Sequence, residues 1–362
     1  MIRMTNGISV YLGMDNTLEE NMTLVKKAAK TGIRRIFTSL HIPEADKNHL
    51  RDELQQLLHL ANGEDMEVIT DVSPLTMEIL EIDSFSLEHF SRLGVKTLRL
   101  DFGFGLDEIA AMSRNDLGIR LQLNASTITE EFLNGLMKAG AKAEALEACH
   151  NFYPRENTGL EEGFLLKKNQ LLHDNGIMVS AFIPSFNRPR SPIGAGLPTL
   201  ELHRCTSFDF SLRHLLALGV DSVFVGDSLP SDGEIQLLGE LDSEHGILLR
   251  PDLWTCKQNI IDLISRSYTT RLDEARDVIR TQESRQYIQE VDFSIRPEQC
   301  GVRNVGYITL DNENYGRYHG ELQIVKKALP SDYRVNIVAS LSNYEMHLLK
   351  YLKPGTRFKF LL

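Results

Sequence analysis

The chain has 362 residues, of which 42% are hydrophobic and 25% charged, an ordinary globular mixture that is long enough for two domains. Its formal net charge of −11 argues against nucleic acid or an anionic membrane as a partner, since no basic run is long enough to override the repulsion. The apolar runs are too short to span a bilayer, and the N-terminal segment lacks the apolar stretch of a secretory signal. Four widely spaced cysteines without CxxC spacing indicate reduced thiols, so the sequence predicts a cytoplasmic protein.

Short apolar segments of β-type composition alternate with amphipathic helical segments over the first two-thirds of the chain. The predicted strands are residues 7–12, 35–39, 67–71, 96–101, 118–124, 143–149, 177–183 and 220–225. The predicted helices are residues 18–30, 46–61, 74–80, 87–93, 106–113, 129–139, 161–175 and 208–218. Eight strand–helix units in about 240 residues predict an α/β fold, a parallel (β/α)₈ TIM barrel. An open doubly wound sheet is the alternative that the same pattern could build.

A glycine stands just before six of these strands, where a helix is expected to end. These glycines are Gly32, Gly94, Gly118, Gly140, Gly176 and Gly219.

After Gly246 the alternation of strands and helices gives way to a β-rich pattern. The predicted strands there are residues 247–250, 290–295, 303–310, 321–325, 335–339 and 357–360, with a short helix at 343–351. We therefore expect two domains, a catalytic barrel at residues 1–246 and a smaller β-rich domain at residues 247–362. No linker rich in Pro, Gly or Ser separates them, which predicts close packing.

In a barrel of this kind, chemistry is carried by the side chains at the carboxyl ends of the strands. Residues 146–159 show the pattern, because an apolar lead-in ends in His150, Asn151 and Tyr153. Other polar residues in this position are Asp15, Ser39, His41, Glu44, Asp71, Ser73, Asp101, Asn124, Ser185, Asn187, Arg188, Asp227 and Ser228. The predicted substrate-binding residues are His41, Asn124, His150, Asn151 and Tyr153. A structural role for His150 is an equally good interpretation.

Carboxylates that face each other across a barrel mouth suit glycoside hydrolysis, in which one protonates the leaving oxygen and the other attacks or stabilises the sugar cation. Any single aspartate in this position is also a good helix N-cap. A metal held by His, Asp and Glu is the alternative chemistry. No tight ligand spacing such as HxH or HExxH occurs, so we predict neither a metal nor a cofactor.

The loops after the last two strands are where barrels commonly hold phosphate. Here they contain Ser185, Asn187, Arg188, Arg190, Gly194, Gly196, Gly226 and Ser228. The second domain adds Arg296, Arg303, Arg317 and His319. We predict that one of Arg188, Arg303 and Arg317 binds phosphate, since convergent arginines can hold such a group.

Several segments together resemble a bacterial family, the 6-phospho-N-acetylmuramidases of glycoside hydrolase family 170. The segments are GISVYLG (7–13), TSLHIPE (38–44), TDVSP (70–74), LRLDFG (98–103), HNFYPR (150–155), VGDS (225–228) and RNVGYITLDNENYGRYHG (303–320). The resemblance covers essentially the whole chain. It implies a TIM barrel followed by a cyclophilin-like domain, a statement of fold and not of isomerase activity. It also implies a cytosolic enzyme of cell-wall recycling that cleaves N-acetylmuramic acid 6-phosphate from N-acetylglucosamine.

The resemblance does not identify the catalytic pair, so the assignment follows from strand position. Asp101 is the predicted nucleophile or ion stabiliser, because the strand LRLD ends in this carboxylate. Asp227 or Asp71 is the predicted acid/base partner. Glu147 is a third candidate, but it lies within a strand and could equally point toward the outer helices.

Other mechanisms and functions remain compatible with the sequence. The 2-acetamido group of a muramyl substrate can itself act as the nucleophile. A phosphosugar lyase or isomerase on the same barrel is an alternative enzyme, and a sugar-phosphate sensor is the non-enzymatic one. Stereochemistry, oligomeric state and the tolerated aglycone do not follow from the sequence.

Overall fold

The computed structural model describes residues 5–39, 42, 50–72, 85–100, 103–290 and 293–362. The chain divides into two compact units, Met1–Ser243 and Glu244–Leu362, each described by itself below.

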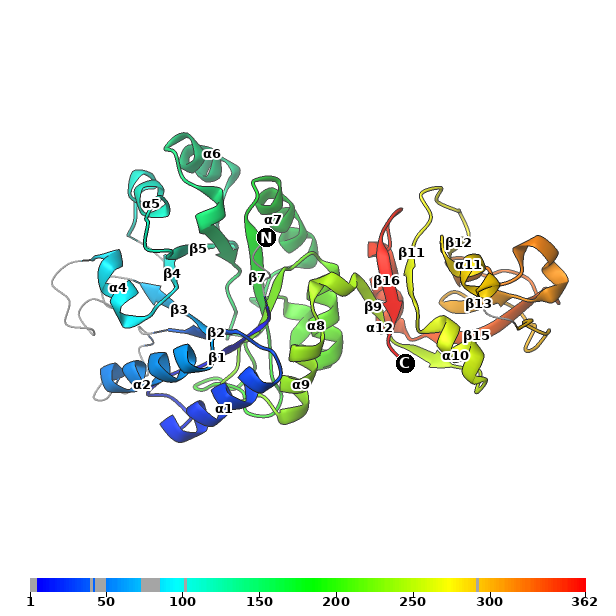
Figure 1. Cartoon of the computed structure of the whole chain (residues 1–362), viewed down its shortest axis with the longest axis horizontal. Helices are drawn as coiled ribbons and strands as arrows, with labels where there is room; N and C mark the ends of the chain where they lie inside the picture. Colours follow the sequence, from blue (N-terminus) through cyan, green and yellow to red (C-terminus); the bar gives the residue numbers. More distant parts are fainter. Residues whose placement is uncertain (1–4, 40–41, 43–49, 73–84, 101–102, 291–292) are drawn as a thin grey trace. The chain divides into compact units, whose positions relative to one another are not determined.

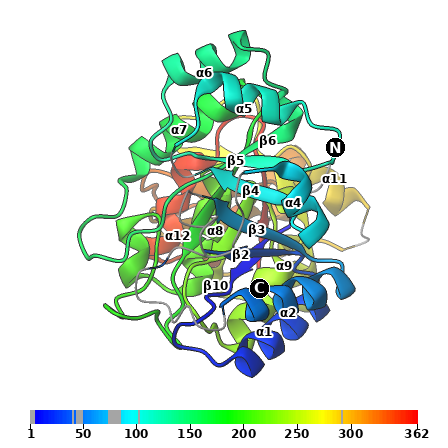
Figure 2. The same cartoon turned by 90° about the vertical axis from the view of Figure 1, so that its left-hand side faces the viewer.

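The first unit is a closed barrel of eight parallel strands surrounded by helices (Figures 1 and 2). The strands are β1 (Gly7–Ser9), β2 (Arg35–Thr38), β3 (Glu67–Val72), β4 (Thr97–Leu100), β5 (Arg120–Asn124), β6 (Leu146–Cys149), β7 (Met178–Ile183) and β8 (Ser222–Val225). The helices are α1 (Leu18–Lys30), α2 (Leu50–Gly63), α4 (Leu87–Leu93), α5 (Leu106–Ser113), α6 (Glu130–Lys138), α7 (Glu162–Asp174), α8 (Phe208–Ala217) and α9 (Asp232–Glu240). Strand β1 pairs in parallel with both β2 and β8. This closure confirms the predicted TIM barrel and excludes the open sheet.

Local sequence signals explain where the helices begin and end. Helix α1 starts after a capping box in which the Thr17 side chain accepts from the Glu20 N–H and the Glu20 side chain accepts from the Thr17 N–H. All six glycines that precede strands have positive φ, for example 86° at Gly94, which closes α4. A left-handed residue favours glycine, and five of the six lie at or next to a helix C-cap, as predicted. Gly118 does not, because α5 already ends at Arg114.

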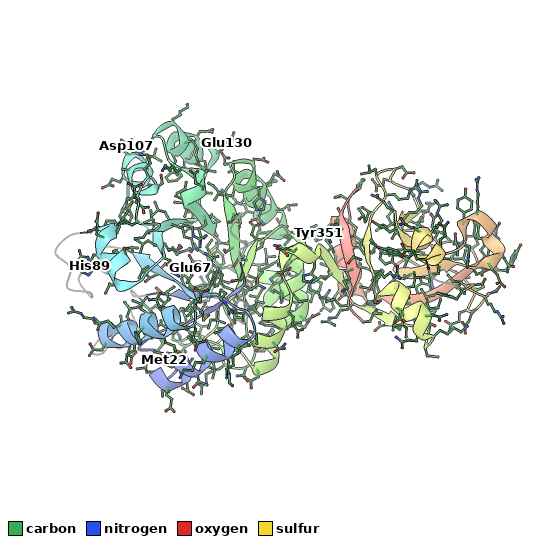
Figure 3. All side chains as sticks on the ribbon, viewed as in Figure 1. Met22, Glu67, His89, Asp107, Glu130 and Tyr351 are labelled. Carbon is green, nitrogen blue, oxygen red and sulfur yellow. The ribbon has the colours of Figure 1, made fainter. Side chains whose placement is uncertain are left out.

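The inside of the barrel departs from the apolar filling that is usual for this fold and that the sequence analysis assumed. Arg35 of β2 bonds to Glu67 of β3, Glu147 of β6, Ser180 of β7 and Ser222 of β8, a set of strands that it can reach together only through the interior. Figure 3 shows Glu67 among the barrel strands, whereas Asp107 and Glu130 lie on the outer helices α5 and α6. The interior near the amino ends of the strands is therefore charged.

The second unit contains a five-stranded sheet in the order β10-β15-β13-β14-β12 and a three-stranded sheet in the order β11-β16-β9. The strands are β9 (Ile247–Leu249), β10 (Pro251–Leu253), β11 (Ser267–Thr269), β12 (Val278–Arg280), β13 (Tyr307–Asp311), β14 (Leu322–Val325), β15 (Val335–Leu341) and β16 (Arg357–Phe360). The helices are α10 (Gln258–Ile264), α11 (Ser284–Gln289) and α12 (Asn343–Leu348). The predicted smaller β-rich unit is confirmed. No helix in the described ranges of either unit is both long and apolar enough to cross a bilayer.

Two predictions in this unit need correction. The described part of the predicted strand at 290–295 is not a strand, because the Ile295 N–H donates to His319 Nε2 (3.0 Å) and its carbonyl accepts from the Glu313 N–H (2.8 Å). These bonds tie the segment to a loop instead of a sheet. Strand β13 begins only at Tyr307, after the positive φ of Gly306 (83°), and not at residue 303.

Candidate active site

Aromatic rings fill the barrel interior toward the carboxyl ends of the strands. We call this set the aromatic floor: Tyr11, Phe37, Phe152, Phe182 and Phe224. Phe152 follows β6 and packs against Tyr11, Phe37 and Phe182 with ring centroids 5.1–6.4 Å apart. The Tyr11 hydroxyl donates to the Gly226 carbonyl (2.6 Å), which ties the chain after β1 to the end of β8.

Asp71 lies on one side of the aromatic floor, near the carboxyl end of β3. The Nε of Arg99 on β4 is 3.4 Å from Asp71 Oδ1, and both side chains are less than 10% exposed. Arg99 Nη2 also donates to Asn151 Oδ1 (2.7 Å). Arg99 thus holds together two predicted site residues, Asp71 and Asn151, that are 80 positions apart. In this carboxylate–guanidinium–amide group, Asp71 lies on β3, Arg99 on β4 and Asn151 in the loop after β6.

Glu147 lies deeper in the barrel, and its side chain is fully buried. Its Oε1 accepts from Arg35 Nη2 (2.5 Å) and Gln122 Nε2 (2.7 Å), so the side chain points into the barrel and not toward the outer helices. Gln122 Oε1 in turn accepts from Arg99 Nη1 (3.1 Å). Glu147 therefore supports Arg99 from below, through Gln122, and has no surface open to a substrate in this structure.

Asp227 follows β8 and is also fully buried. Its Oδ1 accepts from the Arg190 N–H (2.8 Å), and its Oδ2 accepts from the N–H groups of Ser185 (2.9 Å) and Leu197 (3.1 Å). Burial raises the pKa of Asp227, although the three backbone N–H groups act in the opposite direction. Both oxygens are engaged by the loop after β7, so contact with a substrate would require that loop to move.

The predicted phosphate ligands differ in their surroundings. Arg188 Nη1 donates to Asn16 Oδ1 (2.9 Å) and Glu20 Oε1 (3.0 Å), at the start of α1. In the second unit, Arg303 Nε donates to the Pro330 carbonyl (3.0 Å), and Arg317 Nη2 donates to the Tyr318 hydroxyl (2.8 Å). Arg188 is the one predicted phosphate ligand that lies in the barrel unit.

His150 faces outward from the barrel. Its Nε2 is 2.9 Å from Asn169 Oδ1 on α7, and its Nδ1 is 3.3 Å from Ser126 Oγ. Burial lowers the pKa of His150 to about 4, so the ring is neutral at physiological pH. With both ring nitrogens engaged and the side chain fully buried, this geometry is that of a structural histidine.

Two other predicted binding residues keep polar atoms available. Asn124 at the end of β5 accepts the Ser126 N–H on Oδ1 (3.1 Å), which leaves its amide nitrogen for other partners. The hydroxyl of Tyr153 has no hydrogen bond to the part of the chain that the structure describes, and the residue is half-buried. Asp101 and His41, two further predicted site residues, lie outside the described residues.

Sequence analysis missed the residues that organise the rim. Arg204 donates to the carbonyls of Tyr153 (2.9 Å) and Ala195 (2.9 Å) and pairs with Glu201 (2.7 Å). This pairing lowers the pKa of Glu201 to about 2, and Glu201 also accepts the Gly159 N–H (2.7 Å). Together they fix the HNFYPR loop to the loop after β7. Their sequence carries no periodic signal, because they lie in a short 3₁₀ segment.

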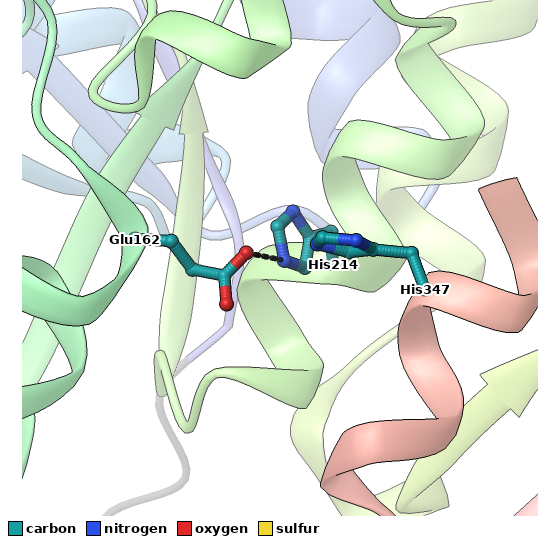
Figure 4. Close-up of side chains that lie close together, drawn as sticks. All are labelled: Glu162, His214 and His347. Atoms are coloured by element: carbon teal, nitrogen blue, oxygen red, sulfur yellow. Dashed lines mark ion pairs between the residues drawn. The ribbon is translucent and has the colours of Figure 1, made fainter.

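Glu162, His203 and His214 form a second group of ionisable residues, outside the barrel strands. Glu162 of α7 and His214 of α8 form an ion pair of 3.4 Å (Figure 4). His214 Nδ1 lies 3.0 Å from His203 Nε2, and both histidines are fully buried. This group sits on helices outside the barrel and does not touch the aromatic floor.

Comparison with known proteins gives matches along nearly the whole chain. The family model described as "6-phospho-N-acetylmuramidase, N-terminal" matches residues 6–240, and the one described as "6-phospho-N-acetylmuramidase, C-terminal" matches residues 246–361. No curated protein matches.

Two solved structures are similar over their full length. One is an uncharacterized Bacillus cereus protein with 30% identity and a TM-score of 0.83, where the similarity covers 100% of each chain. The other is a conserved Enterococcus faecalis protein of unknown function with 34% identity and a TM-score of 0.69, where it covers 99% of this chain and 96% of that one.

Proposed function

Because the chain belongs to the 6-phospho-N-acetylmuramidase family, we propose that it is a glycosidase that hydrolyses N-acetylmuramic acid 6-phosphate–N-acetylglucosamine during cell-wall recycling. The observation that carries this proposal is the family match over both units, together with a carboxylate beside a guanidinium at the barrel mouth. The substrate is a small phosphorylated amino-sugar disaccharide.

The surroundings of Asp71 favour a stabilising role. A neighbouring guanidinium such as that of Arg99 favours the ionised form of a carboxylate. An ionised carboxylate can stabilise the positive charge that develops on the sugar ring, or on the 2-acetamido group if that group attacks. We therefore assign this role to Asp71, and the role of proton donor to Asp101, which follows the next strand in the sequence. This exchanges the two roles that strand position alone suggested.

Asn151 completes the group on the other side of Arg99. Its Oδ1 is used by Arg99 (2.7 Å), and this fixes the direction in which the amide nitrogen points. A fixed N–H donor beside a carboxylate is suited to orienting a sugar hydroxyl or acetamido oxygen. In this proposal Asp227 holds the loop after β7 in place, and Glu147 holds Arg99 through Gln122.

The test is incubation of the purified protein with the phosphorylated disaccharide and with its unphosphorylated twin, in the presence of EDTA, with products read by mass. We expect N-acetylglucosamine and N-acetylmuramic acid 6-phosphate from the phosphorylated sugar alone. Loss of activity with EDTA would favour a metal-dependent lyase, and binding without turnover would favour a sensor.

The roles of Asp101 and Asp71 can be distinguished by measuring the activity of variants on substrates whose leaving groups differ in quality. An Asp101→Asn protein should keep most of its activity on an aryl glycoside with a good leaving group, because such a substrate needs no proton donor. An Asp71→Asn protein should lose activity on every substrate. The opposite pattern would exchange the two roles.

A further inference from the structure

Arg190, in the loop between β7 and β8, differs from its neighbours in that its guanidinium has no hydrogen-bond acceptor among the residues that the structure describes. Within the described ranges it makes neither a side-chain hydrogen bond nor an ion pair, and its Nε is buried without a partner. Arg188, two positions earlier, bonds to Asn16 and Glu20, and Arg204 bonds to Glu201 and several carbonyls. A buried guanidinium N–H without an acceptor costs free energy unless a ligand supplies one.

The side chain is nevertheless held in one place. Its Cζ lies 4.6 Å from the ring centroid of Tyr11 and 5.1 Å from that of Phe152, so two members of the aromatic floor contact the guanidinium. Tyr11 is itself fixed by its bond to the Gly226 carbonyl. The cation is therefore positioned before any ligand binds, which lowers the entropic cost of binding one.

The backbone of Arg190 is fixed as well. Its N–H donates to the buried Asp227 (2.8 Å), which also holds Ser185 and Leu197 at the two ends of the loop. A Cβ at Gly196 would come within 2.9 Å of Pro184, so the loop returns tightly against its own start. Such a loop cannot easily carry the guanidinium away from the rings.

Asp15 and Asp227 lie close enough to attract the guanidinium through space, but neither accepts a hydrogen bond from it. Asp227 uses both oxygens for backbone N–H groups. Asp15 accepts from the Ser191 N–H (2.8 Å) and the Ser228 hydroxyl (3.3 Å). Each carboxylate thus has donors of its own, and no described residue of the chain accepts from the forked donors of Arg190, which suit an added oxyanion.

We propose that Arg190 is the specificity-determining residue that receives an oxyanion of the substrate at the barrel mouth, with Tyr11 and Phe152 holding its guanidinium in place. A guanidinium matches the geometry of phosphate and of carboxylate with two parallel N–H···O bonds. The choice of substrate rests on the proposed function. That sugar carries two oxyanions, the 6-phosphate and the carboxylate of the lactyl group. The position of Arg190 between the last two strands, where barrels hold phosphate, favours the 6-phosphate.

The test compares the full-length wild type with Arg190→Gln, Arg190→Lys and the control Arg92→Gln, at an exposed arginine of helix α4, on three disaccharides. These are the phosphorylated substrate, its unphosphorylated twin, and a phosphorylated analogue that lacks the lactyl group. For Arg190→Gln we expect kcat/KM to fall about 100-fold on both phosphorylated sugars, consistent with one lost charged bidentate contact, and to change little on the twin. Arg190→Lys should lose less, and Arg92→Gln should keep the wild-type preference for phosphate.

If kcat/KM of Arg190→Gln falls only on the two sugars that carry the lactyl group, Arg190 binds the lactyl carboxylate and not the phosphate. An unchanged preference in Arg190→Gln, or an equal loss on all three sugars in a protein with wild-type thermal stability, would overturn the proposal. If the wild type cleaves none of the sugars, the proposed function fails but this inference is still tested by calorimetry with N-acetylmuramic acid 6-phosphate. Wild type and Arg92→Gln should then bind that compound, and Arg190→Gln should bind it at least tenfold more weakly; equal binding by all three would overturn it.

Discussion

At the amino end of the barrel, Arg35 and Arg120 each lie beside two carboxylates, Glu67 and Glu147. At the carboxyl rim, Arg190 has no such partner within the described part of the chain. A cavity of about 580 Å³ opens at the amino end, but its buried charges already neutralise one another. The same residue type therefore serves stability where its donors are used within the chain, and recognition where they are not.

The pKa of Glu67 shows how complete the pairing at the amino end is. Burial alone would raise this pKa, but Arg35 and Arg120 outweigh burial and hold it below the usual range. An acid with a lowered pKa in the folded state adds stability above the pKa of the unfolded chain, and this stability is lost as the pH falls. The amino-end network is thus expected to weaken under acid conditions.

The largest expected effect comes from breaking this network. Glu147→Ala should lower the free energy of unfolding by about 3–5 kcal/mol, because Arg35 would lose a buried partner. Urea unfolding measures the change. Glu147→Gln, which keeps an acceptor, should lose less. A change below about 1 kcal/mol in Glu147→Ala would contradict the structural role given to this end of the barrel.

At the other end, the expected loss is in activity and not in stability. Asp71→Asn should reduce kcat about 10²- to 10⁴-fold, the range typical of a removed catalytic carboxylate, because the charge that stabilises the transition state is gone. The comparison to make is kcat against the midpoint of urea unfolding in the same protein. If Asp71→Asn unfolds at a lower urea concentration but keeps the wild-type kcat, Asp71 has a structural role and not a catalytic one.

A buried carboxylate in the second unit offers the opposite pH response, because burial outweighs the attraction of the nearby Arg303 and Arg334. Burial, followed by the like charge of Glu321, raises the pKa of Asp311 in the second unit to about 7. The unfolded chain releases this proton near pH 4, so the stability of the second unit should fall as the pH rises from about 4 to about 7. Asp311→Asn should remove that dependence and stabilise the unit at pH 8 by at most about 4 kcal/mol. Urea unfolding at pH 5 and pH 8, monitored by a probe in the second unit, measures the pH dependence of its stability and the effect of Asp311→Asn. If the variant keeps the same pH dependence, Asp311 is not its cause.

The smallest effect is expected at the surface. Lys27 and Asp232 form an ion pair of 2.7 Å, but their side chains are 50% and 77% exposed. Asp232→Asn should therefore change the free energy of unfolding by less than about 1 kcal/mol, and high salt should reduce the difference further. If Asp232→Asn lowered the free energy of unfolding as much as Glu147→Ala, burial would not determine how strongly ion pairs stabilise this protein.

Much of the fold could be predicted because its signals are local. Alternating strand and helix segments gave the eight units, glycines with positive φ ended the helices, and Thr17 with Glu20 started one of them. The very short strands β10, β11 and β12 were not predicted, because three residues carry too little periodicity to be distinguished from a loop.

The candidate site could be predicted only in outline. Strand ends indicated Asp71, Asn151 and Asp227 as rim residues, and the structure brings Asp71 and Asn151 to one guanidinium. It places Asp227 instead among three backbone N–H groups, which a sequence pattern cannot reveal. Arg99 was passed over because a charged residue within a strand gives no sign of its partners.

The sequence by itself determined the order of the elements and the number of strand–helix units, because periodicity and chain punctuation act between near neighbours, and its motifs indicated the family. That the sheet closes, with β1 pairing β8, was decided by the tertiary structure. The tertiary structure decided which charges meet. Arg35 and Glu147 are 112 positions apart and bond across the barrel, while Arg190 reaches two rings and, among the described residues, no acceptor. Whether a buried charge stabilises the fold or waits for a ligand depends on such distant contacts, since desolvation and pairing are set by what surrounds the group in space.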